Sequence, residues 1–121
     1  MPARFVTRTI HAYLDYPVAF ALMGLPFVLG IGQSNPMALW LSVATGVAAF
    51  VLTVLTDHHL GIWRVLPYKV HLAVDLLVGV VFLAAPSLFG FSGLDAIYYW
   101  LNGAAVVAVI SLSTPEQGVT A

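Results

Sequence analysis

Residues 16–56 read YPVAFALMGLPFVLGIGQSNPMALWLSVATGVAAFVLTVLT and contain no Asp, Glu, Lys or Arg. A transmembrane helix needs about 20 mostly apolar residues, so this stretch is long enough for two spans. The segment GIGQSNP at 30–36 interrupts it near its middle, and Gly, Asn and Pro together are typical of a turn. The stretch therefore predicts two membrane-spanning helices joined by a short loop.

Two further stretches, 76–94 and 96–115, also lack acidic and basic residues. Each is about the length of one span, and neither shows the period-two alternation of a barrel strand. The sequence thus predicts an all-α integral membrane protein, a four-helix bundle that forms a single transmembrane domain over residues 1–121. The four helices are expected at about 11–30, 36–56, 70–89 and 95–113.

The composition agrees with a membrane protein and excludes several other classes. Apolar residues make up 61% of the chain and charged residues 7%, whereas a soluble domain carries about 25% charged residues. Four Lys and Arg residues are too few for the basic face that a nucleic-acid partner needs. Because the chain has no cysteine, disulfides, thiolate catalysis and Cys-ligated zinc are excluded. The lipid bilayer is the partner that remains.

The basic residues predict the orientation of the chain. Arg4 and Arg8 precede the first expected helix, and Arg64 and Lys69 lie between the second and the third. The other two loops contain no Lys or Arg. The positive-inside rule then places both termini and the 57–69 loop in the cytoplasm of a multi-pass protein.

The chain also repeats itself after 60 residues. Each half reads His-x3-Asp, a long apolar run, Pro-x3-Gly, a short loop and then Trp. The matched pairs are His11 with His71, Asp15 with Asp75, Pro26 with Pro86, Gly30 with Gly90, and Trp40 with Trp100. Because each half holds two expected helices, both halves enter the membrane from the same side. This predicts two tandem hairpins, repeat 1 at about 11–56 and repeat 2 at about 71–113, related by a pseudo-two-fold axis along the membrane normal.

The doubled pattern resembles the SPW-repeat family of small bacterial integral membrane proteins. The resemblance runs from about residue 11 to 113 and rests on HAYLD at 11–15, HLAVD at 71–75, LTDHHLG at 55–61 and APSLFGF at 85–91. The family's Ser-Pro-Trp triplets read here Leu25-Pro26-Phe27 and Ala85-Pro86-Ser87, so the prolines are kept and the tryptophans are replaced. The resemblance implies this fold and a bacterial cytoplasmic (inner) membrane, and it implies no particular activity.

The two His-x3-Asp motifs are the candidate site. His11 and Asp15 are four residues apart and share a helix face, and His71 and Asp75 do the same. The repeat places both pairs at the same depth, and Asp57 at the end of the second helix is expected to join them. Three interpretations stay open at this point: a clamp between the repeats, a site for a metal such as zinc or iron, and a site that binds protons or a small polar ligand.

Two sets of residues carry predictions about helix geometry. Pro26, Gly30, Pro86 and Gly90 predict breaks near the ends of the first and third helices, because proline removes a backbone hydrogen bond. Such breaks form either simple helix ends or a small pocket lined by freed carbonyl groups. Small residues at spacings of four predict close helix packing within the bundle or against a partner; they are Ala38, Ser42 and Gly46 on the second helix, and Ala104 and Ala108 on the fourth.

The sequence contains no P-loop, no Gly-x-Ser-x-Gly and no other recognisable catalytic motif. A membrane enzyme that uses the His/Asp pairs as acid and base is therefore the least favoured interpretation, and no cofactor is predicted. The favoured function is that of a non-enzymatic membrane protein, a structural or accessory subunit of a larger complex or a homo-oligomer. The alternative is a protein that handles an ion, a proton or a small ligand at the His/Asp pairs.

Overall fold

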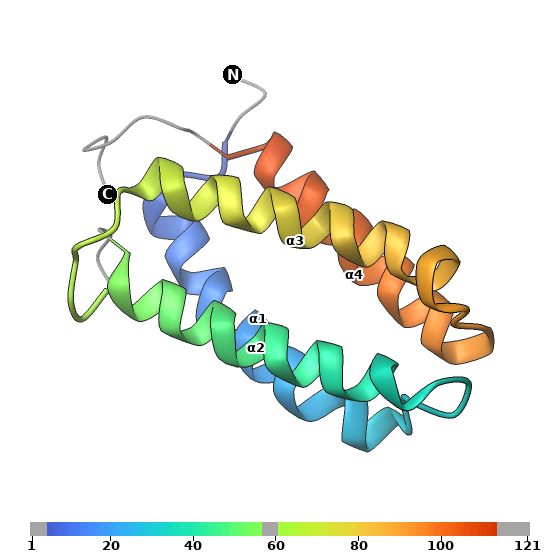
Figure 1. Ribbon diagram of the computed structural model, residues 1–121. Coiled ribbons are helices and arrows are strands. Elements are labelled where there is room, and N and C mark those ends of the chain that lie inside the picture. The colour runs from blue at the N-terminus through green and yellow to red at the C-terminus, as the bar shows by residue number, and fades with distance from the viewer. Residues whose placement is uncertain (1–4, 57–60, 114–121) are drawn as a thin grey trace.

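The computed structural model of the chain describes residues 5–56 and 61–113. These residues form four helices, α1 (Arg8–Leu29), α2 (Pro36–Leu55), α3 (Tyr68–Phe89) and α4 (Gly93–Ser111), which Figure 1 shows. All four helices are long and apolar enough to cross a membrane. The all-α membrane fold predicted from the sequence is confirmed, and the helix bounds differ from the expected ranges by three residues or fewer.

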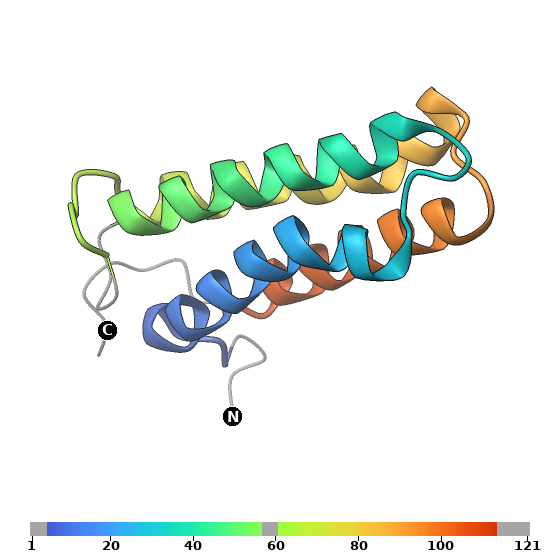
Figure 2. The same ribbon diagram turned by 90° about the horizontal axis from the view of Figure 1, so that it is seen from below.

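The helices are arranged as two hairpins that lie side by side. Helix α1 packs closely against α2, and α3 packs closely against α4, whereas α2 and α3 approach each other at only a few points. Figures 1 and 2 show the short loops after α1 and α3 at one end of the molecule. The starts of α1 and α3 lie together at the other end. Since the bounds of α3 equal those of α1 plus 60, the hairpins form a parallel repeat.

Each hairpin is held by a close approach of small residues. A Cβ atom added at Gly46 would lie 2.6 Å from Met23 Cγ and 2.8 Å from the carbonyl oxygen of Ala19. In the second hairpin, a Cβ atom at Gly103 would lie 2.9 Å from the carbonyl oxygen of Gly79. Ala19 and Gly79 are equivalent positions of the repeat, so the same crossing is used twice. Small residues at a membrane helix crossing allow the backbones to meet.

The two predicted stripes of small residues differ in their positions on the bundle. Ala38, Ser42 and Gly46 are all buried on the packed face of α2. Ala104 and Ala108 are exposed, so the prediction that they pack within this bundle is wrong. The reason is that Gly103 makes the crossing, and a neighbouring residue points about 100° away around the helix. Packing of Ala104 and Ala108 against a partner stays a prediction.

The Pro-Gly pairs lie at the ends of α1 and α3. Both helices continue through their prolines, and each ends at a glycine with φ of 70°, a left-handed conformation that glycine adopts at little cost. The next residue in each hairpin then bonds back to the proline carbonyl, Ile31 N to Pro26 O at 2.8 Å and Phe91 N to Pro86 O at 3.0 Å. These bonds close the last turn of each helix.

The carbonyl that Pro26 leaves without its helical partner is that of Leu22. The hydroxyl of Ser42 donates to it at 2.8 Å, and this bond ties α2 to α1. Since a serine hydroxyl has one hydrogen, the 2.6 Å contact between Ser42 Oγ and Tyr98 Oη has the tyrosine as donor. One buried serine thus connects three helices.

The loop end of the molecule joins the hairpins through Asp95, a residue that the sequence interpretation did not select. Asp95 is 2% exposed and accepts hydrogen bonds from Gly32 N at 2.8 Å and Ser34 N at 2.9 Å in the other hairpin. Its repeat equivalent, Asn35, donates to the carbonyl of Phe89 at 3.1 Å, again across the repeats. Asp95 and Asn35, which are equivalent in the two repeats, therefore each form hydrogen bonds to the other hairpin at this end of the molecule.

The close helix crossing at Gly46 predicts that a single methyl group added there destabilises the protein. We expect Gly46→Ala to lower the free energy of unfolding by about 1–3 kcal/mol, because the new Cβ atom would meet backbone as well as Met23. Gly24→Ala is the matched control, since a Cβ atom at this exposed position has nothing within 4 Å. Thermal unfolding in detergent micelles measures both variants. Equal midpoints for the two variants would contradict the close crossing.

Candidate functional site: a His/Asp cluster between the repeats

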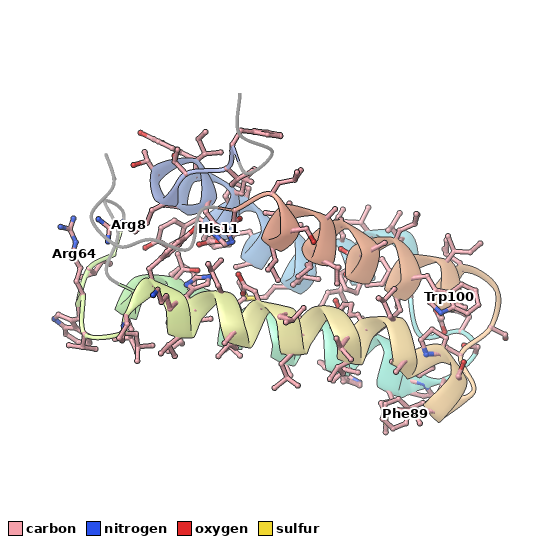
Figure 3. All side chains as sticks on the ribbon, turned by 90° about the horizontal axis from the view of Figure 1, so that it is seen from above. Arg8, His11, Arg64, Phe89 and Trp100 are labelled. Atoms are coloured by element: carbon pink, nitrogen blue, oxygen red, sulfur yellow. The ribbon has the colours of Figure 1, made fainter. Side chains whose placement is uncertain are left out.

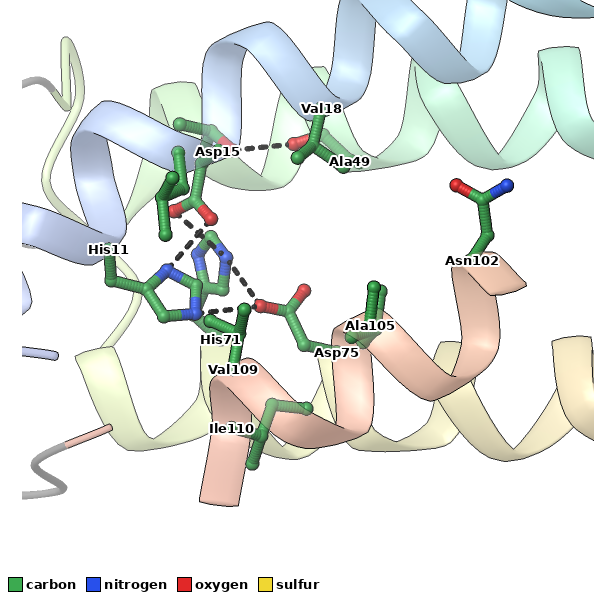
Figure 4. A pocket seen from close by; sticks show the side chains of 13 residues that line it. His11, Asp15, Val18, Ala49, His71, Asp75, Asn102, Ala105, Val109 and Ile110 are labelled. Atoms are coloured by element: carbon green, nitrogen blue, oxygen red, sulfur yellow. Dashed lines mark hydrogen bonds and ion pairs between the residues drawn. The ribbon is translucent and has the colours of Figure 1, made fainter. Parts of the chain in front are cut away.

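The His-x3-Asp motifs of the two repeats meet in one cluster, which Figure 4 shows. Within the repeats, His11 Nδ1 lies 2.7 Å from Asp15 Oδ1, and His71 Nε2 lies 3.1 Å from Asp75 Oδ2. Across the repeats, His11 Nε2 lies 3.3 Å from Asp75 Oδ2, and His71 Nε2 lies 3.3 Å from Asp15 Oδ2. Each imidazole therefore contacts both carboxylates, and we call these four residues the His/Asp cluster.

The cluster lies near the starts of α1 and α3. At 1.5 Å per residue, the histidines are about 5 Å and the aspartates about 10 Å along their helices. Figure 3 shows His11 at the same end of the molecule as Arg8 and Arg64, with Phe89 and Trp100 at the opposite end. Neither helix has an acidic residue in its first turn, so the free backbone N–H groups of the helix starts do not pair with these aspartates.

The side chains of the cluster are largely removed from solvent. The exposed fractions are 3% for His11, 2% for His71, 9% for Asp15 and 20% for Asp75. The two imidazole rings meet edge to face with centroids 5.3 Å apart, and the ring of Tyr68 packs edge-on against His11. Charges in such a place are costly unless they are paired.

Thr56 fixes which nitrogen of His71 carries a hydrogen. The Thr56 hydroxyl donates to the carbonyl of Leu52 at 2.6 Å, and this uses its one hydrogen. The 2.7 Å contact between Thr56 Oγ1 and His71 Nδ1 therefore has the imidazole as donor. With the hydrogen on Nδ1, the other nitrogen of the ring, Nε2, is directed at the carboxylates of Asp15 and Asp75.

This geometry sets the charge that the cluster requires. A neutral His71 would present the lone pair of Nε2 to two carboxylate oxygens, which is repulsive. His11 faces carboxylate oxygens with both nitrogens, and a neutral ring has a hydrogen for only one of them. Hydrogens at all of these nitrogen–oxygen contacts require two additional protons on the imidazoles, and a bound cation between the four side chains would remove that requirement.

A cavity of about 150 Å³ extends from the cluster between the two hairpins, and all four helices contribute to its walls. The walls are mostly apolar side chains, among them Val18, Val106 and Val109. Asp75, the most exposed member of the cluster, borders this cavity at one end, and Figure 4 shows Asn102 at the other. The site is thus a polar cluster at one end of an apolar pocket.

Sequence reasoning found four of the site residues and missed a fifth. Thr56 belongs to no repeated motif, and its partner His71 is 15 residues away, so no local spacing pointed to it. Asn102 is the one strongly polar residue within the apolar run of α4, a signal that the sequence does carry. Its amide group donates to the carbonyl of Tyr98 at 2.7 Å. Asp57, which was expected to join the cluster, lies outside the described residues.

The hydrogen bond between His71 and the hydroxyl oxygen of Thr56 predicts that this oxygen contributes to the stability of the protein. We expect Thr56→Val to lower the free energy of unfolding by about 1–3 kcal/mol, because the buried Nδ1–H would lose its acceptor. Thr45→Val is the matched control, since its hydroxyl bonds only to the carbonyl of Leu41 in its own helix. Thermal unfolding in micelles compares the two. An equal loss in both variants would show that His71 does not depend on Thr56.

Comparison with known proteins adds no relative to this description. No protein-family model, no curated protein and no solved structure matches the chain. The resemblance to the SPW-repeat family therefore stays a prediction that rests on the motifs themselves. What the chain shows by its own residues is a small multi-pass integral membrane protein with a charged cluster between its two repeats.

Proposed function

We propose that this protein is a non-enzymatic membrane protein that binds a cation at the His/Asp cluster. The observation that carries the proposal is that two partly buried carboxylates face three imidazole nitrogens, and two neutral imidazoles do not have enough hydrogens for these contacts. A bound cation would supply positive charge at the same place. It contacts both repeats at once, so binding and the cohesion of the two hairpins share one site.

The pocket supports binding over a purely structural clamp. Two hairpins that only need to stay together can be joined by neutral polar contacts such as that between Ser42 and Tyr98, whereas a buried ion pair carries a large desolvation penalty. The cluster instead borders a cavity, and the Asp75 carboxylate is 20% exposed there. An ionisable group within a membrane helix that also lines a cavity is a functional group by default.

A role as a subunit of a larger assembly is a second candidate, and one observation favours it. Ala104 and Ala108 form a stripe of small residues on the exposed face of α4, beside the exposed Leu101. Small-xxx-small faces of this kind let another helix approach closely. The partner is a second copy of the chain or another membrane protein, and this role is compatible with cation binding.

The setting that we propose is the bacterial cytoplasmic membrane, in a protein of the SPW-repeat type with both termini in the cytoplasm. The motifs of the two repeats support the family, and the distribution of Lys and Arg supports the orientation. In this orientation the His/Asp cluster lies near the cytoplasmic surface. A cation would then reach it from the cytoplasm.

The orientation is testable because the chain has no native cysteine. Single cysteines are placed by Gln33→Cys in the loop after α1 and by Ile62→Cys before α3, both at exposed positions. In intact cells we expect a membrane-impermeant maleimide to label the first variant and not the second. Each variant is its own control after the cells are opened, when both should react. The reverse pattern would invert the proposed topology.

Cation binding is tested by native mass spectrometry of the protein gently extracted from its own membrane. We expect the wild-type chain to carry one additional non-lipid mass. The double variant Asp15→Asn, Asp75→Asn should lack it, because it removes both negative charges. Thr45→Val, which is not part of the cluster, should retain it. The absence of an additional mass on the wild-type chain would reject the proposal. The cluster would then only join the two repeats, through protonated imidazoles.

A further inference from the structure

We infer that the cation is a divalent transition metal of the zinc class, held in a four-coordinate site with two nitrogen and two oxygen ligands. The ligand atoms are His11 Nε2, His71 Nε2, Asp15 Oδ2 and Asp75 Oδ2. This inference rests on the proposed cation-binding function and names its ligand. It does not depend on the family resemblance or on the orientation in the membrane.

The distances within the cluster fit such a site. A tetrahedral zinc ion with bonds of about 2.0–2.2 Å separates its ligand atoms by about 3.3–3.6 Å. Three of the separations between Nε2 and Oδ2 atoms in the cluster are 3.1, 3.3 and 3.3 Å. Each of the four residues also offers a ligand atom, and these atoms all lie within 4.8 Å of one another. The four residues therefore bring donor atoms together within a space about as wide as a metal site.

The same distances fit direct ion pairs less well. A charge-assisted hydrogen bond between imidazolium and carboxylate has an N–O distance of about 2.7–2.9 Å. Only the contact between His11 Nδ1 and Asp15 Oδ1, at 2.7 Å, is that short. All three contacts made by the Nε2 atoms are longer. The Nε2 atoms thus lie where ligands of a shared ion would lie.

The Nδ1 atoms of both imidazole rings make contacts of the kind that metal-binding histidines make. A ligating imidazole commonly has its second nitrogen held by a carboxylate, a backbone carbonyl or another polar group, which fixes the orientation of the ring. His71 Nδ1 donates to Thr56, and His11 Nδ1 contacts Asp15 Oδ1. The other oxygen of Asp15, Oδ2, lies 3.3 Å from His71 Nε2. Both Nε2 atoms are therefore directed inward by the contacts of Nδ1.

The donor types select the class of metal. Imidazole nitrogen suits zinc, iron, copper and nickel, whereas calcium and magnesium prefer sites built from oxygen atoms alone. A divalent ion with two carboxylates and two neutral imidazoles has no net charge. Neutrality matters here because the cluster is buried between helices of membrane-spanning length.

The experiment uses Co²⁺ as a spectroscopic probe on the full-length protein, stripped with a chelator and kept in micelles. We expect one Co²⁺ per chain, with the intense visible absorption of a four-coordinate site, and complete displacement by Zn²⁺. Thr56→Val keeps all four ligands and should weaken Co²⁺ binding by about 10- to 100-fold. Thr45→Val should bind like the wild type. Circular dichroism verifies that each variant keeps its helices.

The outcomes separate this inference from the proposed function. An additional mass that proves to be a cation other than a transition metal would overturn the metal and leave cation binding intact. No additional mass and no Co²⁺ absorption would overturn both. Unchanged Co²⁺ binding in the double variant Asp15→Asn, Asp75→Asn would also overturn this site, because the metal would then be bound elsewhere in the chain.

Discussion

The junction of the two repeats is built on contacts between two partly buried carboxylates and two buried imidazoles. Within each hairpin, the helices meet through the small residues around Gly46 and Gly103. Between the hairpins the contacts are fewer, and several of them are polar, including those of Tyr98 and Tyr99 with α2. The His/Asp cluster joins one end, and Asp95 joins the other. In a bilayer, apolar contact gains little over contact with lipid, so these polar groups have a large share in holding the hairpins together.

The repeat explains how a short motif builds a complete site. A single His-x3-Asp segment offers two ligands on one helix face, too few to enclose an ion. Two copies related by a parallel pseudo-two-fold axis meet where α1 and α3 come together, and the ligand set doubles. The symmetry is broken around the site, because His71 is oriented by Thr56 while His11 is oriented by its own Asp15. One site therefore forms on the axis, with different surroundings on its two sides.

The sequence was sufficient for the fold because charge-free stretches of membrane-spanning length leave few alternatives. The repeat also placed His11 and His71 at one depth, but depth does not tell which way a helix face points. For the same reason the spacing of Ala104 and Ala108 predicted packing in the bundle, while Gly103 next to them makes the crossing. The roles of Thr56 and Asp95 depend on partners in other segments of the chain, and no local pattern reveals such pairs.

In the proposed function, the clamp and the metal site are two charge states of one arrangement. Without a metal, the two carboxylates obtain their positive charge from two additional protons on the imidazoles, and the hairpins stay joined. With a divalent metal, both imidazoles bind in the neutral form, and two protons leave as the ion enters. The total charge is the same in both states, which matters in a membrane because a change in net charge would be costly there. A site of the proposed kind would therefore exchange its occupant while the junction between the repeats is preserved.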